Sequence, residues 1–351
     1  MGSSNLAHAL VILRSLWKRP RGQQALNTYF LQLPVELILC IADFLTPPDL
    51  ILLSQTCHPL RTIFWKHTDI TKLSRTERLS YLAGLAREQP KKWICQKCMT
   101  LHRMAKLDTP AAEFSQSSCP RQQIGEIRFD IRLWYGQIKL EHRHIQLALK
   151  YTRLRQHKYD KYLRAVMTPY LDTHFDPRSK ARVKIEYAAY PKIATACNAE
   201  LKFLLLSTWR CYTRKKKISF NDIGDLPICP HVTIEPWYPW RPSDPGYGLQ
   251  QAIHGALEGR GDGKEHTGSC PRCTTDFSVK LESRWLDLHV WQDFGSESSP
   301  GDIAWEVHCD RLSLNGTPNL WDIGLTLEHE PGTIRKLYEK NGRCASQSQR
   351  G

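Results

Sequence analysis

The apolar residues near the N-terminus fall into short groups separated by prolines. Four of them recur at helical spacing behind Pro34: Leu37, Ile38, Ile41 and Leu45. Pro34 suits the first turn of a helix, where its missing N–H is harmless. Because Pro47 disfavours a helical residue before it, we expect this helix to end at Thr46.

The next two groups predict two more short helices. Thr46 stands as an N-cap with Asp49 at the third helical position, as in a capping box. The apolar face of that helix continues through Leu50, Leu53 and Cys57. After a break at 58–59, a third helix is predicted from Leu60, Ile63, Phe64 and Trp65. Short helices like these bury too little surface to be stable alone, so we expect the module to complete its core against the chain or a partner.

The order of residues in this segment resembles an F-box. The resemblance rests on Leu33-Pro34, Glu36-Leu37, Ile41, Leu45, Asp49-Leu50, Leu53, Cys57, and Leu60-Arg61 followed by Trp65. In F-box proteins the helices dock on a Skp-type adaptor, which tethers them to a cullin–RING ubiquitin ligase. The resemblance therefore implies these adaptor-binding residues: Leu33, Pro34, Glu36, Leu37, Ile41, Leu45, Leu50, Leu53, Cys57, Leu60 and Trp65. An ordinary helical hairpin packed on its own domain is the alternative.

A weaker resemblance extends beyond the helices. Residues 79–102 look like a segment of F-box proteins from filamentous fungi, with a helix followed by Cys95-x-x-Cys98-x-x-Leu101-His102. Such proteins often carry a later Cys-Pro-His and a further Cys-x-x-Cys, and here these are 229–231 and 270–273. This resemblance implies a link to the ligase and says nothing of the target protein.

The same cysteines predict structural zinc. A Cys-x-x-Cys turn presents two sulfurs to one ion, and zinc prefers four thiolate or imidazole ligands. The expected first site consists of Cys229, His231, Cys270 and Cys273. The expected second site consists of Cys95, Cys98, Cys119 and His102. A rival pairing joins Cys95 and Cys98 to Cys270 and Cys273, and spacing alone does not separate the schemes.

The remaining cysteines are interpreted as free or buried thiols, since Cys alone behaves as a small hydrophobe. They are Cys40, Cys57, Cys197, Cys211, Cys309 and Cys344. A catalytic zinc would need an open coordination position and a nearby acid or base, and we expect structural zinc instead.

Beyond residue 105 the pattern predicts an α+β fold with a mixed or antiparallel sheet. Residues 124–133 alternate apolar and charged, as in a half-buried strand. Helical spacing then links Leu140, His144, Leu147, Tyr151 and Leu154. Strands are expected at 183–187 and 201–213, and a hairpin at 277–281 and 285–294. Most late tryptophans are expected in the core, whereas the proline-rich segment 235–242 is expected to be a loop, for which recognition is one candidate role.

These patterns divide the chain into five parts. They are a basic N-terminal extension (1–30), the F-box (31–70), a helical linker with the first Cys-x-x-Cys (71–104), an α+β recognition region (105–340) and a tail (341–351).

Composition narrows the function only a little. The chain has 49 Lys and Arg against 35 Asp and Glu, a net charge of +14, which suits acidic proteins, nucleic acid or anionic lipid. Two basic stretches, 142–164 and 214–217, are interpreted as a solvated helix face and a charged loop. No apolar run reaches the roughly 18 residues of a membrane span. Phosphate-loop, GxGxxG, GxSxG and HExxH motifs are absent.

We therefore expect a non-catalytic substrate-receptor subunit of an SCF-type ubiquitin ligase. Its partners would be a Skp-type adaptor, through it a cullin–RING complex, and an unidentified protein substrate, with no membrane and no nucleic acid. The alternative is a basic, zinc-containing nucleic-acid-binding protein. The N-terminal charges follow the apolar stretch instead of preceding it, unlike a secretory signal, so we expect a cytoplasmic or nuclear protein.

Overall fold

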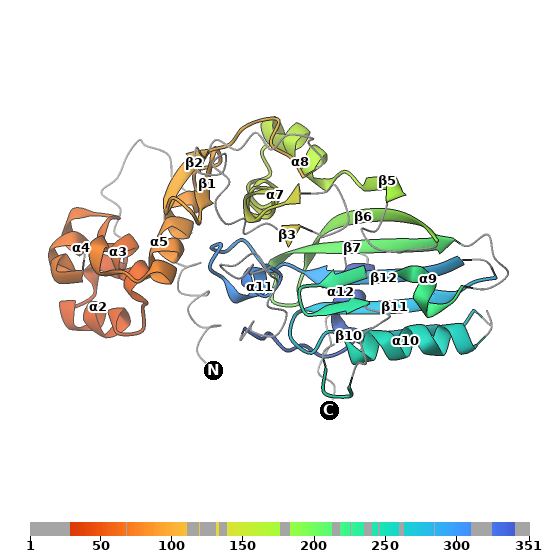
Figure 1. Ribbon diagram of the computed structural model, residues 1–351. Helices are drawn as coiled ribbons and strands as arrows, with labels where there is room; N and C mark the ends of the chain where they lie inside the picture. The colour runs from red at the N-terminus through yellow and green to blue at the C-terminus, as the bar shows by residue number, and fades with distance from the viewer. Residues whose placement is uncertain are drawn as a thin grey trace, which may run out of the picture. The chain divides into compact units, whose positions relative to one another are not determined.

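The structure is a computed structural model that divides the chain into two units, one up to Glu88 and one from Gln89 onward (Figure 1). It describes residues 29–67, 69–110, 119, 131–132, 139–175, 183–212, 218–224, 226–234, 241–244, 246–259, 263–283, 285–309 and 325–340. Several predictions lie outside these residues: most of the 124–133 strand, the 214–217 cluster, most of the 235–242 loop, Trp321 and Cys344.

Unit 1 is a helical module. Its helices are α2 (Val35–Ala42), α3 (Pro47–Ser54), α4 (His58–Ile63) and α5 (Arg75–Arg87), with 3-10 turns η1 (Tyr29–Gln32), η2 (Trp65–His67) and η3 (Ile70–Lys72). Its core cluster consists of Ile38, Ala42, Leu53, Leu60 and Phe64. Helix α5 completes the module, since Leu52 lies against Gly84 and the Gln55 side chain donates to Tyr81 Oη at 2.9 Å.

Two details of the predicted helices are wrong. Helix α2 ends at Ala42, before Thr46, because the amides of Phe44 and Leu45 bond three residues back and tighten the chain into a turn. Thr46 is the N-cap of α3, but its hydroxyl donates to the Asp49 carboxylate at 2.7 Å and caps no backbone N–H. The capping box of unit 1 lies at α5 instead, between Ser74 and Glu77.

Unit 2 contains a six-stranded antiparallel sheet, which confirms the predicted α+β fold (Figure 1). The strand order is β10 (Glu265–Ser269), β11 (Thr275–Leu281), β12 (Trp285–Asp293), β7 (Leu201–Tyr212), β6 (Lys184–Thr195) and β5 (Tyr170–Phe175). The predicted hairpin is confirmed, with Leu281 opposite Leu286. Residues alternate between the two faces of each strand, and one face carries the buried core side chains Ile185, Phe203, Leu205, Phe277 and Leu288.

Helices and small hairpins surround this sheet. The helices are α7 (His142–Leu154), η4 (His157–Tyr159), α8 (Asp160–Met167), α9 (Phe220–Ile223), α10 (Tyr247–Glu258), α11 (Ile303–Glu306) and α12 (Thr333–Glu339). The hairpins are β1 (Lys92–Cys95) with β2 (Thr100–Arg103), β3 (Ile131–Arg132) with β4 (Lys139–Leu140), and β8 (Leu226–Cys229) with β9 (Val232–Ile234). Helix α10 packs beside the ring of Phe277, whereas Asp276, which points to the opposite face, accepts from the amide of Ile334 in α12.

Helix α7 confirms the predicted helix but corrects the interpretation of its charges. Arg143 and Lys150 are fully buried, so the solvated-face interpretation is wrong for both. Lys150 Nζ donates to the Lys92 carbonyl at 2.8 Å, which ties α7 to the edge of β1. Arg143 donates from Nε and Nη2 to both oxygens of Asp108, at 2.5 and 2.8 Å. The interpretation holds for the exposed Arg155, Lys158, Lys161 and Arg164.

Asp108 is the centre of this buried polar group. Burial raises its pKa, but hydrogen bonds from His144 and Arg143 outweigh burial and hold the pKa of this carboxyl well below its usual range. Asp108 is therefore a carboxylate at neutral pH, and together with Glu141, whose carboxylate also contacts the guanidinium, it neutralises the buried charge of Arg143.

Candidate functional site

Apart from Glu36, every residue of helix α2 is apolar. Ile38 and Ala42 point into the core of unit 1. Away from that core, Val35, Leu37 and Leu39 remain 49%, 49% and 45% exposed, and Phe44 in the following turn is 78% exposed. A helix at a protein surface normally presents polar residues to water, and one that is apolar all round is normally covered. We call these four exposed residues the α2 apolar surface.

The structure sorts the residues implied for adaptor binding into three groups. Pro34, Glu36, Leu37 and Trp65 are exposed. Leu33, Ile41, Leu45, Leu50 and Cys57 are half-buried. Leu53 and Leu60 are buried within the module, at 9% and 3% exposure, so they hold its helices together and offer no surface to a partner.

Sequence reasoning missed three members of the α2 apolar surface: Val35, Leu39 and Phe44. The signal was present in the helical spacing. When Ile38 faces the core, Val35 and Leu39 lie on the same side of the helix, four positions apart. Leu37 then faces away from the core, and Phe44, seven positions later, follows it on that side.

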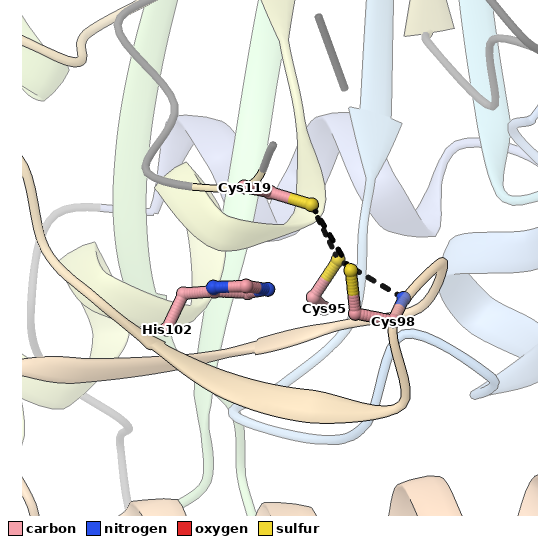
Figure 2. Close-up of side chains that lie close together, drawn as sticks. All are labelled: Cys95, Cys98, His102 and Cys119. Atoms are coloured by element: carbon pink, nitrogen blue, oxygen red, sulfur yellow. Dashed lines mark hydrogen bonds between the residues drawn. The ribbon is translucent and has the colours of Figure 1, made fainter. Parts of the chain in front are cut away.

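The first Cys/His group lies at the β1–β2 hairpin and comprises Cys95, Cys98, His102 and Cys119; we call it the hairpin cluster. Cys95 ends β1, the chain reverses through Met99 with φ of 53°, and His102 lies on β2 opposite Trp93. Within the turn, the amide of Cys98 donates to Cys95 Sγ at 3.5 Å. Cys119 comes from a separate segment and reaches the two turn cysteines while the His102 ring points toward them (Figure 2).

The spacing of the hairpin cluster fits a metal ion. Its four ligand atoms lie within 4.8 Å of one another. Cys119 Sγ lies 3.2 Å from Cys98 Sγ and 3.6 Å from Cys95 Sγ. Zinc–sulfur bonds of about 2.3 Å place two sulfurs of a tetrahedron about 3.8 Å apart, whereas a disulfide needs about 2.05 Å. Burial raises the pKa of the Cys95 thiol to about 12, so binding an ion there must displace its proton.

The second group comprises Cys229, His231, Cys270 and Cys273; we call it the sheet cluster. Cys229 ends β8, His231 stands in the turn before β9, and the other two cysteines lie between β10 and β11. All four are buried, with exposures of 6%, 5%, 1% and 0% in that order. The amide of Arg272 donates to Cys270 Sγ at 3.4 Å, a turn like that of the hairpin cluster.

His231 gives the sheet cluster an independent sign of a missing ligand. Both ring nitrogens are buried, and neither has a hydrogen-bond partner among the residues that the structure describes. An unsatisfied polar atom in the interior costs about 1–3 kcal/mol. A metal ion bound by one of these nitrogens and the three sulfurs would remove that cost for that atom.

The structure brings the residues of each predicted ligand set together, and it does not bring together those of the rival pairing. Cys95 and Cys98 lie with His102 and Cys119, not with Cys270 and Cys273. Outside both clusters, Cys211 and Cys309 are buried thiols, Cys57 is half-buried, and Cys40 and Cys197 are exposed. Each cluster supplies four candidate ligands, the number found at closed structural zinc sites.

Comparison with known proteins gives one match. A family model described as F-box-like matches residues 30–70. No curated protein matches the chain, and no solved structure matches it. Among the described residues, no helix is both long and apolar enough to cross a membrane. The F-box-like match spans α2, α3 and α4, so the segment that is similar to an F-box is also the one that bears the α2 apolar surface.

Proposed function

We propose that this chain is the substrate-receptor subunit of an SCF-type cullin–RING ubiquitin ligase. Unit 1 binds a Skp-type adaptor, and unit 2 binds a target protein that remains to be identified. The observation that carries the proposal is the α2 apolar surface within the segment that matches the F-box-like family. In this role the chain has no chemistry of its own, because it acts by holding a target close to the ubiquitin-loaded enzyme.

Adaptor binding supplies the direct test. We expect the full-length chain to capture a purified Skp-type adaptor, and the double variant Leu37→Asp/Phe44→Asp to lose it, because two carboxylates would be desolvated at the contact. Leu171→Asp is the matched control: Leu171 is 66% exposed and lies on β5, in unit 2. Equal capture by the double variant and the control would contradict the proposal.

The burial of Leu53 decides how such variants should be chosen. Leu53→Asp would place a charge in the core of unit 1, so loss of binding in that variant would report unfolding of the module. Leu37 and Phe44 lie outside the core cluster, so their substitution separates recognition from folding.

We also propose that zinc occupies both Cys/His clusters, as structural staples of unit 2. Three thiolates and one imidazole suit zinc, and the orphaned nitrogens of His231 support a metal over a set of free thiols. Elemental analysis of the purified chain should give about two zinc ions per molecule, one for each tetrahedral cluster. A metal-free chain that is fully folded would overturn this assignment.

A further inference from the structure

The two Cys/His clusters differ sharply in their access to solvent. Every ligand of the sheet cluster is at least nine-tenths buried, so a small oxidant in water has no direct approach to its sulfurs. In the hairpin cluster Cys98 and His102 are only half-buried, whereas Cys95 and Cys119 are fully buried. Oxidation of cysteine follows thiolate character and exposure, so the difference in exposure predicts a difference in reactivity.

The hairpin cluster also holds a resolving thiol beside the accessible one. Cys98 Sγ lies 3.2 Å from Cys119 Sγ, and Cys119 belongs to a segment remote in sequence. The two sulfurs need to approach by only about 1.1 Å to reach disulfide length. Cys98 lies in the turn between β1 and β2, next to Met99 with φ of 53°, and so outside the hydrogen-bonded strands.

We propose that the hairpin cluster is a peroxide-sensitive metal switch, while the sheet cluster is a permanent staple. The inference rests on the zinc assignment of the hairpin cluster made above, and it does not depend on adaptor binding. The oxidant is hydrogen peroxide.

The chemistry balances with peroxide as the sole oxidant. The Cys98 thiolate attacks one peroxide oxygen, so an S–O bond forms, the O–O bond breaks, and the departing hydroxide takes a proton to become water. The Cys119 thiolate then attacks the sulfur of that sulfenic acid: an S–S bond forms, the S–O bond breaks, and a second hydroxide leaves as water. Two electrons pass from the two sulfurs to the peroxide. Cys95 and His102 then remain as two ligands, too few for a closed zinc site.

Loss of this staple has a local structural consequence. The β1–β2 hairpin would keep its tie to α7, because Gln146 Oε1 accepts from the Ile94 amide at 3.1 Å and Lys150 bonds the Lys92 carbonyl. The Cys98 turn would exchange its metal link for the Cys98–Cys119 disulfide, while Cys95 and His102 would no longer be held by an ion. The sheet would be unaffected, since its own cluster holds β8–β9 to the β10–β11 connection.

The test measures zinc release from the zinc-loaded, full-length chain under hydrogen peroxide, with a chromophoric chelator. We expect one equivalent of zinc to be released, the second to be retained, and peptide mapping to find a Cys98–Cys119 disulfide. A thiol reductant with added zinc should reverse the reaction. Hydrogen exchange should rise at 95–103 and stay unchanged at 275–281.

Two variants sharpen this test. Cys98→His keeps a zinc ligand but removes the attacking thiol, so this variant should retain both equivalents under peroxide. Cys197→Ser removes an exposed thiol outside both clusters and should behave as wild type. The proposal is overturned if both zinc ions leave at the same rate, or if neither leaves while Cys197 is oxidised. It is also overturned if zinc is released without formation of the Cys98–Cys119 disulfide, or if the hairpin cluster binds no zinc. Adaptor capture, measured on the same samples, reports separately on the proposed ligase role.

Discussion

The F-box resemblance implies adaptor binding for both Leu37 and Leu53, but the two leucines differ in burial. Truncating Leu53 to alanine should mainly lower the stability of unit 1, whereas truncating Leu37 should mainly weaken adaptor binding. Leu53 is 9% exposed and belongs to the core cluster of unit 1, whereas Leu37 is 49% exposed. Leu53→Ala removes buried methyl groups and should destabilise unit 1 by about 2–5 kcal/mol. Leu37→Ala lies at the surface and should change that stability by less than about 0.5 kcal/mol.

Affinity for the adaptor should show the reverse order. Burying a whole leucine side chain contributes about 2 kcal/mol, so docking over the exposed half of Leu37 contributes about 1 kcal/mol, or roughly fivefold in Kd. Phe44 is 78% exposed. A larger ring with more surface to cover should therefore contribute about 2 kcal/mol, or roughly 30-fold.

Two assays on the full-length chain check this pair of expectations. Hydrogen exchange of the α2 and α3 amides reports the local stability of unit 1, and calorimetric titration with a purified Skp-type adaptor reports Kd. The reasoning about exposure would be refuted if Leu37→Ala raised exchange as much as Leu53→Ala does. It would also be refuted if Leu37→Ala and Phe44→Ala both left Kd unchanged.

Three further predictions concern unit 2. Cys273→Ser should remove one of two zinc equivalents in elemental analysis, while Cys211→Ser, at an equally buried cysteine outside the clusters, should remove none. The pKa of Asp108 is depressed in the folded chain, so its stabilising effect is present above the unfolded pKa of about 3.9 and is lost as pH falls through the folded value. Asp108→Asn should therefore lower the free energy of unfolding by about 3 kcal/mol at pH 7. In chemical denaturation at a series of pH values, the variant should lose less stability than wild type as the pH falls. The exposed basic residues of η4 and α8 (Lys158, Lys161 and Arg164) should give the chain no measurable affinity for duplex DNA or RNA at about 0.15 M salt. An affinity that falls steeply with salt and is abolished by Lys158→Glu/Lys161→Glu would favour the nucleic-acid alternative instead.

The features predicted most reliably from the sequence are those set by residues close together along the chain, such as turns and single strands. A Cys-x-x-Cys turn fixes its two sulfurs locally, and each pair lies in the expected cluster. The strands expected at 201–213, 277–281 and 285–294 have strong apolar patterns and were confirmed as β7, β11 and β12. The order of strands, with β7 beside β12 and β5 at an edge, depends on contacts between remote segments, which no local pattern records.

The misses have a common physical origin. Arg143 and Lys150 are polar in the sequence, yet both are buried, because they donate hydrogen bonds to a carboxylate and to two backbone carbonyls of remote segments. Leu53 and Leu60 match the F-box resemblance in sequence, but the resemblance does not distinguish a residue that holds the module together from one that contacts a partner. Side-chain environment, and not residue type, decided each case.

The division of the chain at Glu88 has a consequence for the proposed ligase role. Both Cys/His clusters lie after that residue, and the α2 apolar surface lies before it. If both proposals hold, a cell starved of zinc would still produce chains whose unit 1 binds the adaptor, although their unit 2 would lack its two metal sites. Such chains would act as decoys, occupying ligase complexes without delivering any target for ubiquitination.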